Sequence, residues 1–223
     1  MERKPPHNAP APSTPDRRFI SHEEAQARMV TDASGEEYFE GYGIVFNKRS
    51  QMLGGWFVEV IKPEAVRNIM DATDRRVDAH HITHQILGRQ KAGTASFEVD
   101  EIGMKYRAKN IGTTYAEDVA KNIRAGNIDG SSFEFMVAPN GDEWELMNEN
   151  GVEFYLRTIN NFEVVPAMGP VINPAYLDTS ANLASAKRSL DAWQAEHRTE
   201  PPTPPTPPAP TGHNPDALAI LFG

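Results

Sequence analysis

Proline is distributed unevenly along this chain, and the distribution limits where a compact fold can form. Of the 18 prolines among 223 residues, five lie in residues 1–15, seven in residues 201–210 and one at position 215. Because proline lacks a backbone N–H and fixes φ, segments this rich in it do not form helix interiors or central strands. Only five prolines remain in residues 16–200, so we expect the folded part of the chain there.

Hydrophobic patterning divides the chain into four parts. We expect a flexible N-terminal arm over residues 1–37, a folded domain over residues 38–183 and a C-terminal helix over residues 184–200. Residues 201–223 are expected to be a disordered proline-rich linker with an apolar tip.

Composition excludes several classes of protein. The chain has 22 basic and 31 acidic residues and a net charge of −9, which argues against a nucleic-acid partner. It has no cysteine, so disulfides, thiolate metal sites and cysteine nucleophiles are excluded. No apolar run is long enough to span a bilayer. We therefore expect a soluble intracellular protein with no membrane partner.

Aromatic and β-branched runs separated by turn residues, with apolar–polar alternation in residues 96–108, predict a β-rich α+β domain, mostly antiparallel, with a few helices. The predicted strands are residues 38–46, 55–61, 76–80, 96–99, 104–108, 128–137, 142–147, 152–159 and 162–165. Short helices are expected after Pro63 and after Thr114, where Thr114 and Glu117 have capping-box spacing. Pro166 is expected to follow the end of the last strand.

All three histidines outside the tails lie together, at positions 80, 81 and 84. A metal site is one interpretation, but no HExxH pattern or cysteine accompanies them, and adjacent strand residues face opposite ways. We expect no metal and no cofactor. The histidines then form either an ordinary polar loop or a general base at the end of a strand.

Two further segments carry groups that could work with a histidine. Ser131 and Ser132 follow Gly130 at the head of a predicted strand, although Gly-Ser-Ser is also ordinary turn composition. Glu163 is flanked by apolar residues, so it either is partly buried beside a histidine N–H or faces solvent on an edge strand. Serine, histidine and carboxylate together are compatible with nucleophilic acyl transfer.

The order of these segments resembles the tailed-phage prohead maturation proteases, serine endopeptidases related to the herpesvirus assemblins. The similar pieces begin with residues 40–46 and residues 55–63, followed by His81 placed seven residues before Gly88. They continue with the helix and Gly-x-Ser-Phe-x-Phe strand of residues 114–135 and the closing residues 162–176. In place of the Asn and Asp common around the family's histidine, this chain has His80 and Ile82, and Glu134 replaces a frequent glycine.

The resemblance implies a structure, an activity and partners. It implies a closed or partly open β-barrel flanked by helices, with Ser132 as nucleophile, His81 as general base and Glu163 as the acid that orients it. It also implies cleavage of scaffold protein or a capsid-protein extension inside the immature capsid, in the host cytoplasm, with self-cleavage and a homo-oligomer as further expectations. The alternative is a catalytically silent scaffold- or capsid-binding assembly module. A metal hydrolase built on His80, His81 and His84 is a more distant third.

Overall fold

Three β-sheets with helices at their edges make up the computed structural model, which describes residues 15–70, 74–172 and 180–197. The five-stranded sheet has the order β1 (Asp16–Ile20), β9 (Gly130–Val137), β12 (Phe162–Val171), β5 (Arg76–Asp78) and β6 (Ile86–Arg89). A three-stranded sheet consists of β10 (Asp142–Glu149), β11 (Val152–Ile159) and β4 (Phe57–Ile61). A four-stranded sheet consists of β2 (Arg28–Thr31), β3 (Glu37–Val45), β8 (Gly103–Lys109) and β7 (Ala95–Val99).

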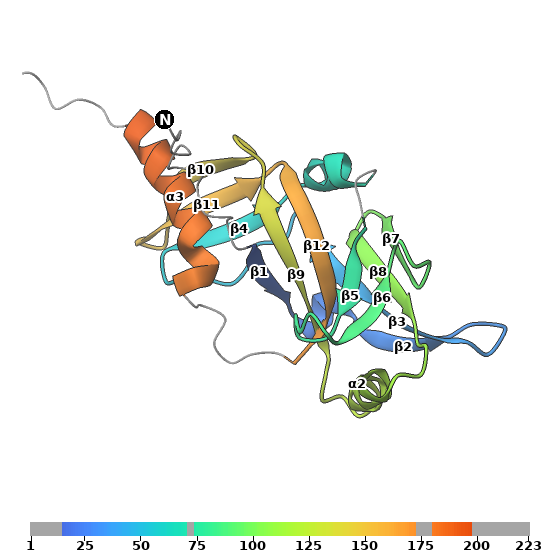
Figure 1. Ribbon diagram of the computed structural model, residues 1–223. Coiled ribbons are helices and arrows are strands. Elements are labelled where there is room, and N and C mark those ends of the chain that lie inside the picture. The colour runs from blue at the N-terminus through green and yellow to red at the C-terminus, as the bar shows by residue number, and fades with distance from the viewer. Residues whose placement is uncertain (1–14, 71–73, 173–179, 198–223) are drawn as a thin grey trace, which may run out of the picture.

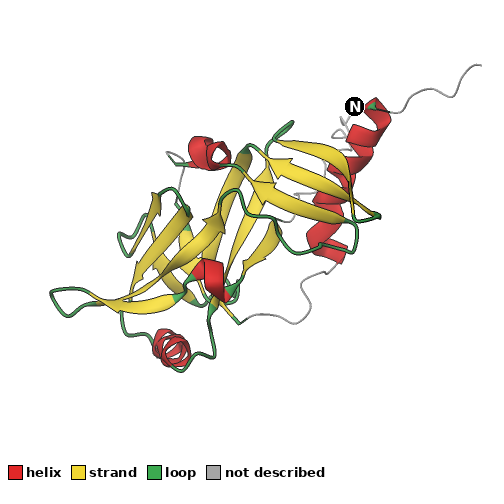
Figure 2. Cartoon of the chain, turned by 180° about the vertical axis from the view of Figure 1, so that it is seen from behind, coloured by secondary structure: helices red, strands yellow, loops and turns green. Residues whose placement is uncertain are grey.

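The helices lie around the outside of the strands (Figure 2). They are α1 (His22–Ala25), the 3₁₀ helix η1 (Pro63–Ile69), α2 (Thr114–Arg124) and α3 (Ser180–Glu196). Figure 1 shows α3 beside β10 and β11, and α2 at the other end of the molecule near β2. No helix in the described part of the chain has the length and apolar character needed to cross a membrane.

The β-rich, mostly antiparallel architecture predicted from the sequence is confirmed. Two neighbouring pairs, β12 with β5 and β11 with β4, are parallel, and the other strand pairs are antiparallel. The expectation was a closed or partly open barrel; none of the three sheets closes on itself in the described residues, so the closed form is not present and a partly open arrangement is consistent with the structure.

The N-terminal boundary differs from the expectation of a flexible arm over residues 1–37. Residues 16–31 contain β1, α1 and β2, and β1 pairs with β9 along its whole length. The inward-facing side chains of β1 include Asp16 and Arg18, which are 3% and 6% exposed. Their burial depends on ionic and hydrogen-bonding partners far away in the sequence, so no hydrophobic pattern marks this strand.

Two local boundary signals also behave differently from the prediction. The N-cap of α2 is Thr113, not Thr114, and it makes no side-chain cap hydrogen bond. The carboxylate of Glu117 instead accepts a hydrogen bond from Asn110 at 2.9 Å, so the predicted capping box is not formed. Strand β12 continues past Pro166 to Val171, because the register shift between Val164 and Ala167 accommodates a residue without an N–H.

Two hydrophobic clusters hold these elements together. The larger joins β3, β8, β9, β12 and α2 around the buried rings of Phe133, Phe135 and Phe162. The smaller docks α3, whose Leu190 belongs to the same buried cluster as Phe57 and Trp144. Helix α3 runs from Ser180 to Glu196, so it begins four residues before the C-terminal helix expected over residues 184–200. The predictions for residues 1–14, for the closing motif at residues 173–176 and for the proline-rich segment 201–223 fall outside the described residues.

Candidate active site

One histidine and one serine from distant parts of the sequence meet on the five-stranded sheet. Nε2 of His81 lies 2.6 Å from Oγ of Ser132, within hydrogen-bond distance. Ser132 lies in β9 opposite Phe19 of β1 on one side and Gly169 of β12 on the other. Both side chains are nearly excluded from solvent, with His81 7% and Ser132 6% exposed. The pair has the arrangement required of a nucleophile and its general base.

The backbone of the histidine segment is unusual. Strand β5 ends at Asp78, and His80 and His81 both adopt left-handed conformations with φ of 56° and 57°. For residues other than glycine this conformation costs about 1–3 kcal/mol each and requires support from neighbours. The N–H of His80 donates to the carbonyl of Pro170, and the N–H of Ile82 donates to that of Ala79. His80 and His81 therefore do not lie in a strand with their side chains on opposite faces, as the sequence suggested. They form a turn, supported by these hydrogen bonds, that directs His81 toward Ser132.

The three histidines of the cluster are separated in space by this turn. His81 faces Ser132, whereas Nδ1 of His80 accepts a hydrogen bond of 3.4 Å from the N–H of Ile172. His84 is exposed on the surface. Within residues 15–70, 74–172 and 180–197, no group of histidine and carboxylate side chains has an arrangement that could hold a metal ion.

The two adjacent serines have different environments because successive side chains of a strand face opposite sides. Ser131 is fully buried, and its Oγ lies 2.9 Å from the hydroxyl of Tyr106 in the core. Ser132 and Glu134 share the other face of β9 with His81. Of the two serines, only Ser132 is therefore in a position to be activated by a histidine.

Two carboxylates lie next to the other ring nitrogen of His81. Its Nδ1 is 3.7 Å from Oδ1 of Asp78 and 3.7 Å from Oε1 of Glu134. Arg76 links the two acids, with its Nε donating to Asp78 at 2.7 Å and its Nη2 to Glu134 at 2.9 Å. Arg17 of β1 also donates to Glu134, at 2.9 Å. The histidine, both acids and both arginines therefore form one cluster of ionisable side chains.

Within this cluster, Nδ1 of His81 and Oδ1 of Asp78 are buried and have no hydrogen-bond partner. A separation of 3.7 Å is too long for a hydrogen bond, so the two atoms face each other without one. Burial lowers the pKa of His81 to about 4 and raises the pKa of the Asp78 carboxyl. The imidazole is therefore neutral near pH 7 and able to accept a proton.

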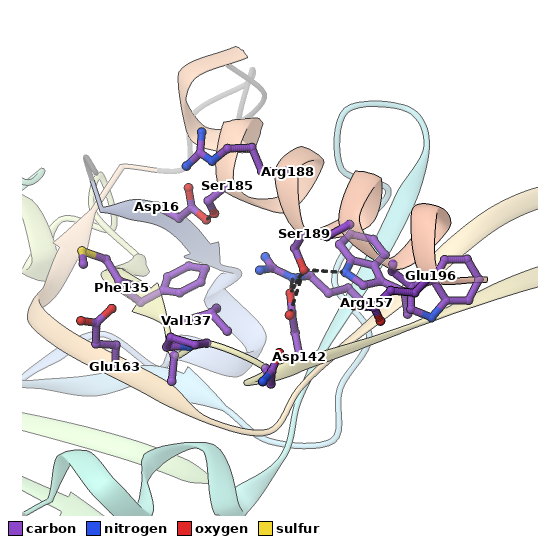
Figure 3. Close-up of a pocket in the computed structure, with 17 residues that line it drawn as sticks. Asp16, Phe135, Val137, Asp142, Arg157, Glu163, Ser185, Arg188, Ser189 and Glu196 are labelled. Atoms are coloured by element: carbon purple, nitrogen blue, oxygen red, sulfur yellow. Dashed lines mark hydrogen bonds and ion pairs between the residues drawn. The ribbon is translucent and has the colours of Figure 1, made fainter. Parts of the chain in front are cut away.

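Glu163, the acid predicted from the sequence, is not brought to this pair. It is exposed at the start of β12 and lines a cavity of about 370 Å³ together with residues of β9, β10 and α3 (Figure 3). No contact joins Glu163 to His81 or Ser132 in the described residues. Asp78, which ends β5 three residues before His81, belongs to no sequence motif that marked it in advance.

The hydroxyl of Ser132 has a second partner in β1. Its Oγ donates to the carbonyl oxygen of Arg18 at 2.7 Å, in addition to its contact with His81. A serine hydroxyl has one proton, so it cannot donate to Arg18 and to His81 at the same time. The β1 backbone therefore competes with the histidine for the proton of the serine.

The family model described as caudovirus prohead serine protease matches residues 23–195, which include β5, β9 and both members of the histidine–serine pair. No curated protein and no solved structure matches the chain. The resemblance to the herpesvirus assemblins stays a prediction.

Proposed function

Because the chain belongs to the caudovirus prohead serine protease family, we propose that it is a capsid-maturation endopeptidase with Ser132 as nucleophile and His81 as general base. The observation that supports this assignment is the distance of 2.6 Å between Nε2 of His81 and Oγ of Ser132. The core position of Ser131, bonded to Tyr106, supports the choice between the two serines.

In the proposed reaction, Oγ of Ser132 attacks the carbonyl carbon of the scissile peptide bond while Nε2 of His81 takes its proton. The resulting imidazolium then gives that proton to the leaving amine, and the acyl group stays bonded to Ser132. A water molecule, deprotonated by the same histidine, then hydrolyses this acyl-enzyme. The low pKa of His81 favours the neutral ring that the first step requires.

We propose Asp78, in place of Glu163, as the carboxylate that positions His81. Oδ1 of Asp78 has no partner and faces Nδ1 of the ring, so rotation of either side chain would give an N–H to carboxylate hydrogen bond. Glu134 is less suited to this role, because Arg17 and Arg76 already occupy its two oxygens. A carboxylate on Nδ1 selects the tautomer with a free Nε2 lone pair and stabilises the imidazolium.

The proposed substrates are scaffold protein or a capsid-protein extension inside the procapsid, in the host cytoplasm. Membership of a prohead protease family supports capsid proteins as substrates. Self-cleavage and a homo-oligomeric state belong to the same proposal.

The test is to co-express the chain with the neighbouring scaffold and capsid proteins and to follow their sizes by gel and mass spectrometry. Cleavage is expected with the unmodified chain and with Ser131→Ala, and no cleavage with Ser132→Ala. Cleavage by Ser132→Ala would refute the nucleophile assignment. Assembly that needs the chain but proceeds without any cleavage would favour the catalytically silent assembly module.

A further inference from the structure

Strand β1 occupies the edge of β9 beside the catalytic pair. It runs antiparallel to β9, with Phe19 opposite Ser132 and Arg18 opposite Phe133. The other edge of β9 is filled by β12, so β1 lies on the edge that another extended peptide could take. Addition of a strand to a sheet edge is a common way for proteins to bind extended peptides.

The β1 backbone lies where a substrate backbone is needed. The carbonyl oxygen of Arg18 is 2.7 Å from Oγ of Ser132, so this peptide group is within reach of the proposed nucleophile. The side chain of Phe19, the residue after Arg18, packs closely over Gly130. A Cβ atom at Gly130 would lie only 2.3 Å from the Phe19 ring. The glycine at the head of β9 therefore leaves room for the residue that follows the carbonyl.

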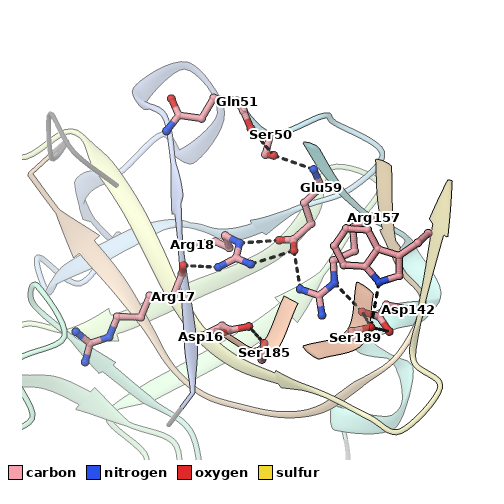
Figure 4. Close-up of polar contacts among 11 residues, drawn as sticks. Asp16, Arg17, Arg18, Ser50, Gln51, Glu59, Asp142, Arg157, Ser185 and Ser189 are labelled. Atoms are coloured by element: carbon pink, nitrogen blue, oxygen red, sulfur yellow. Dashed lines mark hydrogen bonds and ion pairs between the residues drawn. The ribbon is translucent and has the colours of Figure 1, made fainter. Parts of the chain in front are cut away.

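The Arg18 side chain is held in a buried site built for a guanidinium. Its Nε and Nη2 donate to the two carboxylate oxygens of Glu59 at 2.9 and 3.1 Å, as Figure 4 shows. The side chains of Arg18 and Glu59 are 7% and 3% exposed. The guanidinium carbon also lies 5.1 Å from the centre of the Phe135 ring. A bidentate carboxylate and an aromatic ring together favour arginine over lysine.

The charges around this site require a cation in it. Glu59 also accepts from Arg157 at 3.0 Å, and Arg157 in turn donates to Asp142 at 2.7 Å (Figure 4). Burial works to raise the pKa of Glu59, but the two guanidinium groups outweigh it and the pKa is lowered, so the carboxylate is charged. Without Arg18, two carboxylates would share the one guanidinium of Arg157. A buried excess of negative charge is costly, so a ligand that replaces β1 should bring its own cation.

We propose that the β9 edge occupied by β1 is the substrate groove, and that Glu59 selects an arginine as the residue whose carbonyl faces Ser132. Strand β1 is then a substrate-like occupant of the groove, which a capsid or scaffold peptide must displace. A cavity of about 340 Å³ beside β1, lined in part by Glu59, Phe133 and Leu183, gives the incoming side chains room to enter. The selection of arginine at a scissile bond rests on the proposed protease function.

Peptide binding by the full-length chain tests this proposal without requiring catalysis. Ser132→Ala prevents cleavage, and Arg18→Ala in the same chain weakens the hold of β1 on the groove. The probe is a fluorescent peptide with the sequence of residues 15–21, and the matched peptide has leucine in place of the arginine at position 18. By fluorescence anisotropy, the arginine peptide should bind at least about tenfold more tightly than the leucine peptide.

Two further variants identify the origin of that preference. Adding Glu59→Gln should reduce the difference between the two peptides to about twofold or less, because a neutral amide no longer pairs with the guanidinium. Arg124→Ala, which removes an arginine paired with Glu37 on the surface, replaces Arg18→Ala in the control. That control should bind both peptides weakly, because β1 still occupies the groove. Thermal unfolding followed by circular dichroism verifies that each variant is folded.

Equal binding of the two peptides, or no binding of either to the folded Arg18→Ala chain, would overturn the proposal. If Arg18→Ala does not fold, Arg18→Lys keeps a buried cation and is tested in the same way. If these variants bind the arginine peptide selectively but the chain with Ser132 intact cleaves no substrate, the result would count against the protease function alone. Cleavage with no preference for arginine would count against the role of Glu59 alone.

Discussion

Nδ1 of His81 and Oδ1 of Asp78 face each other at 3.7 Å, and each is a buried polar atom without a hydrogen-bond partner. Buried polar groups in native proteins nearly always have partners, so two unpaired atoms directed at one another require an explanation. The proposed explanation is a hydrogen bond that forms when His81 becomes charged. The competing contact between Ser132 and Arg18 fits the same view, because it holds the serine proton away from the ring.

Asp78→Asn tests the proposed positioning role. The amide keeps the size of the side chain but cannot stabilise an imidazolium, so we expect kcat to fall by about 100-fold or more with little change in KM. The measurement is steady-state cleavage of a capsid-derived peptide. The rival assignment predicts that this loss occurs in Glu163→Gln instead, and a normal kcat for Asp78→Asn would disprove the role of Asp78.

The pH profile of cleavage should reflect the buried state of His81. Burial lowers its pKa to about 4, so the ring stays unprotonated, and able to act as a base, at pH values below its ordinary range. The acidic limb of kcat/KM, which reports the free enzyme, should therefore lie below pH 6.5 and toward 4. A limb at or above pH 6.5 would show that the histidine is not desolvated in the working enzyme.

Ser131→Ala should cost stability without abolishing cleavage. The substitution leaves the buried hydroxyl of Tyr106 without its partner at 2.9 Å, at a cost of about 1–3 kcal/mol in the free energy of unfolding. Tyr106→Phe in the same chain should recover part of that loss, because both polar groups are then absent. Urea unfolding of the single and double variants measures the coupling, and strictly additive losses would contradict a direct bond.

Leu190→Ala should reveal how strongly α3 is held to the sheet. Leu190 is 4% exposed and packs in the cluster of Phe57 and Trp144, so its truncation should reduce the free energy of unfolding by about 2–5 kcal/mol. Lys187→Ala on the same helix removes only an exposed ion pair with Asp191 and should change stability by less than about 1 kcal/mol. Similar effects of the two substitutions in urea unfolding would indicate that α3 is not docked as described.

The sequence was sufficient to predict most strands and the histidine–serine pair. Strands β3 and β4 are rich in aromatic and β-branched residues and β8 alternates apolar with polar residues, which predicts them, and the resemblance to a known family singled out His81 and Ser132. The sequence was insufficient where a contact between two residues depends on the order of strands in the sheet. Ser132 and Arg18 are 114 residues apart, and only the pairing of β1 with β9 brings them together.

The proposal of Asp78, in place of Glu163, as the carboxylate that positions His81 depended on the three-dimensional structure for the same reason. Glu163 has apolar neighbours in the sequence, as a buried partner of histidine would, yet it lies exposed at the start of β12. Asp78 lies beside the ring because β5 ends there and a left-handed turn directs His81 back toward it. Neither the end of the strand nor the turn has a reliable signal in local composition, because the conformation of the turn is supported by contacts with β12.

Covalent labelling of the serine tests the central claim most directly. The full-length chain and its Arg18→Ala variant are treated with a fluorophosphonate, and the modified residue is mapped by peptide mass spectrometry. We predict an adduct on Ser132 that forms faster in Arg18→Ala and disappears in His81→Ala, because the reagent requires a nucleophile activated by a base. An adduct on Ser131, or no adduct on Ser132 in either protein, would contradict the assignment of Ser132 and His81 as the catalytic pair.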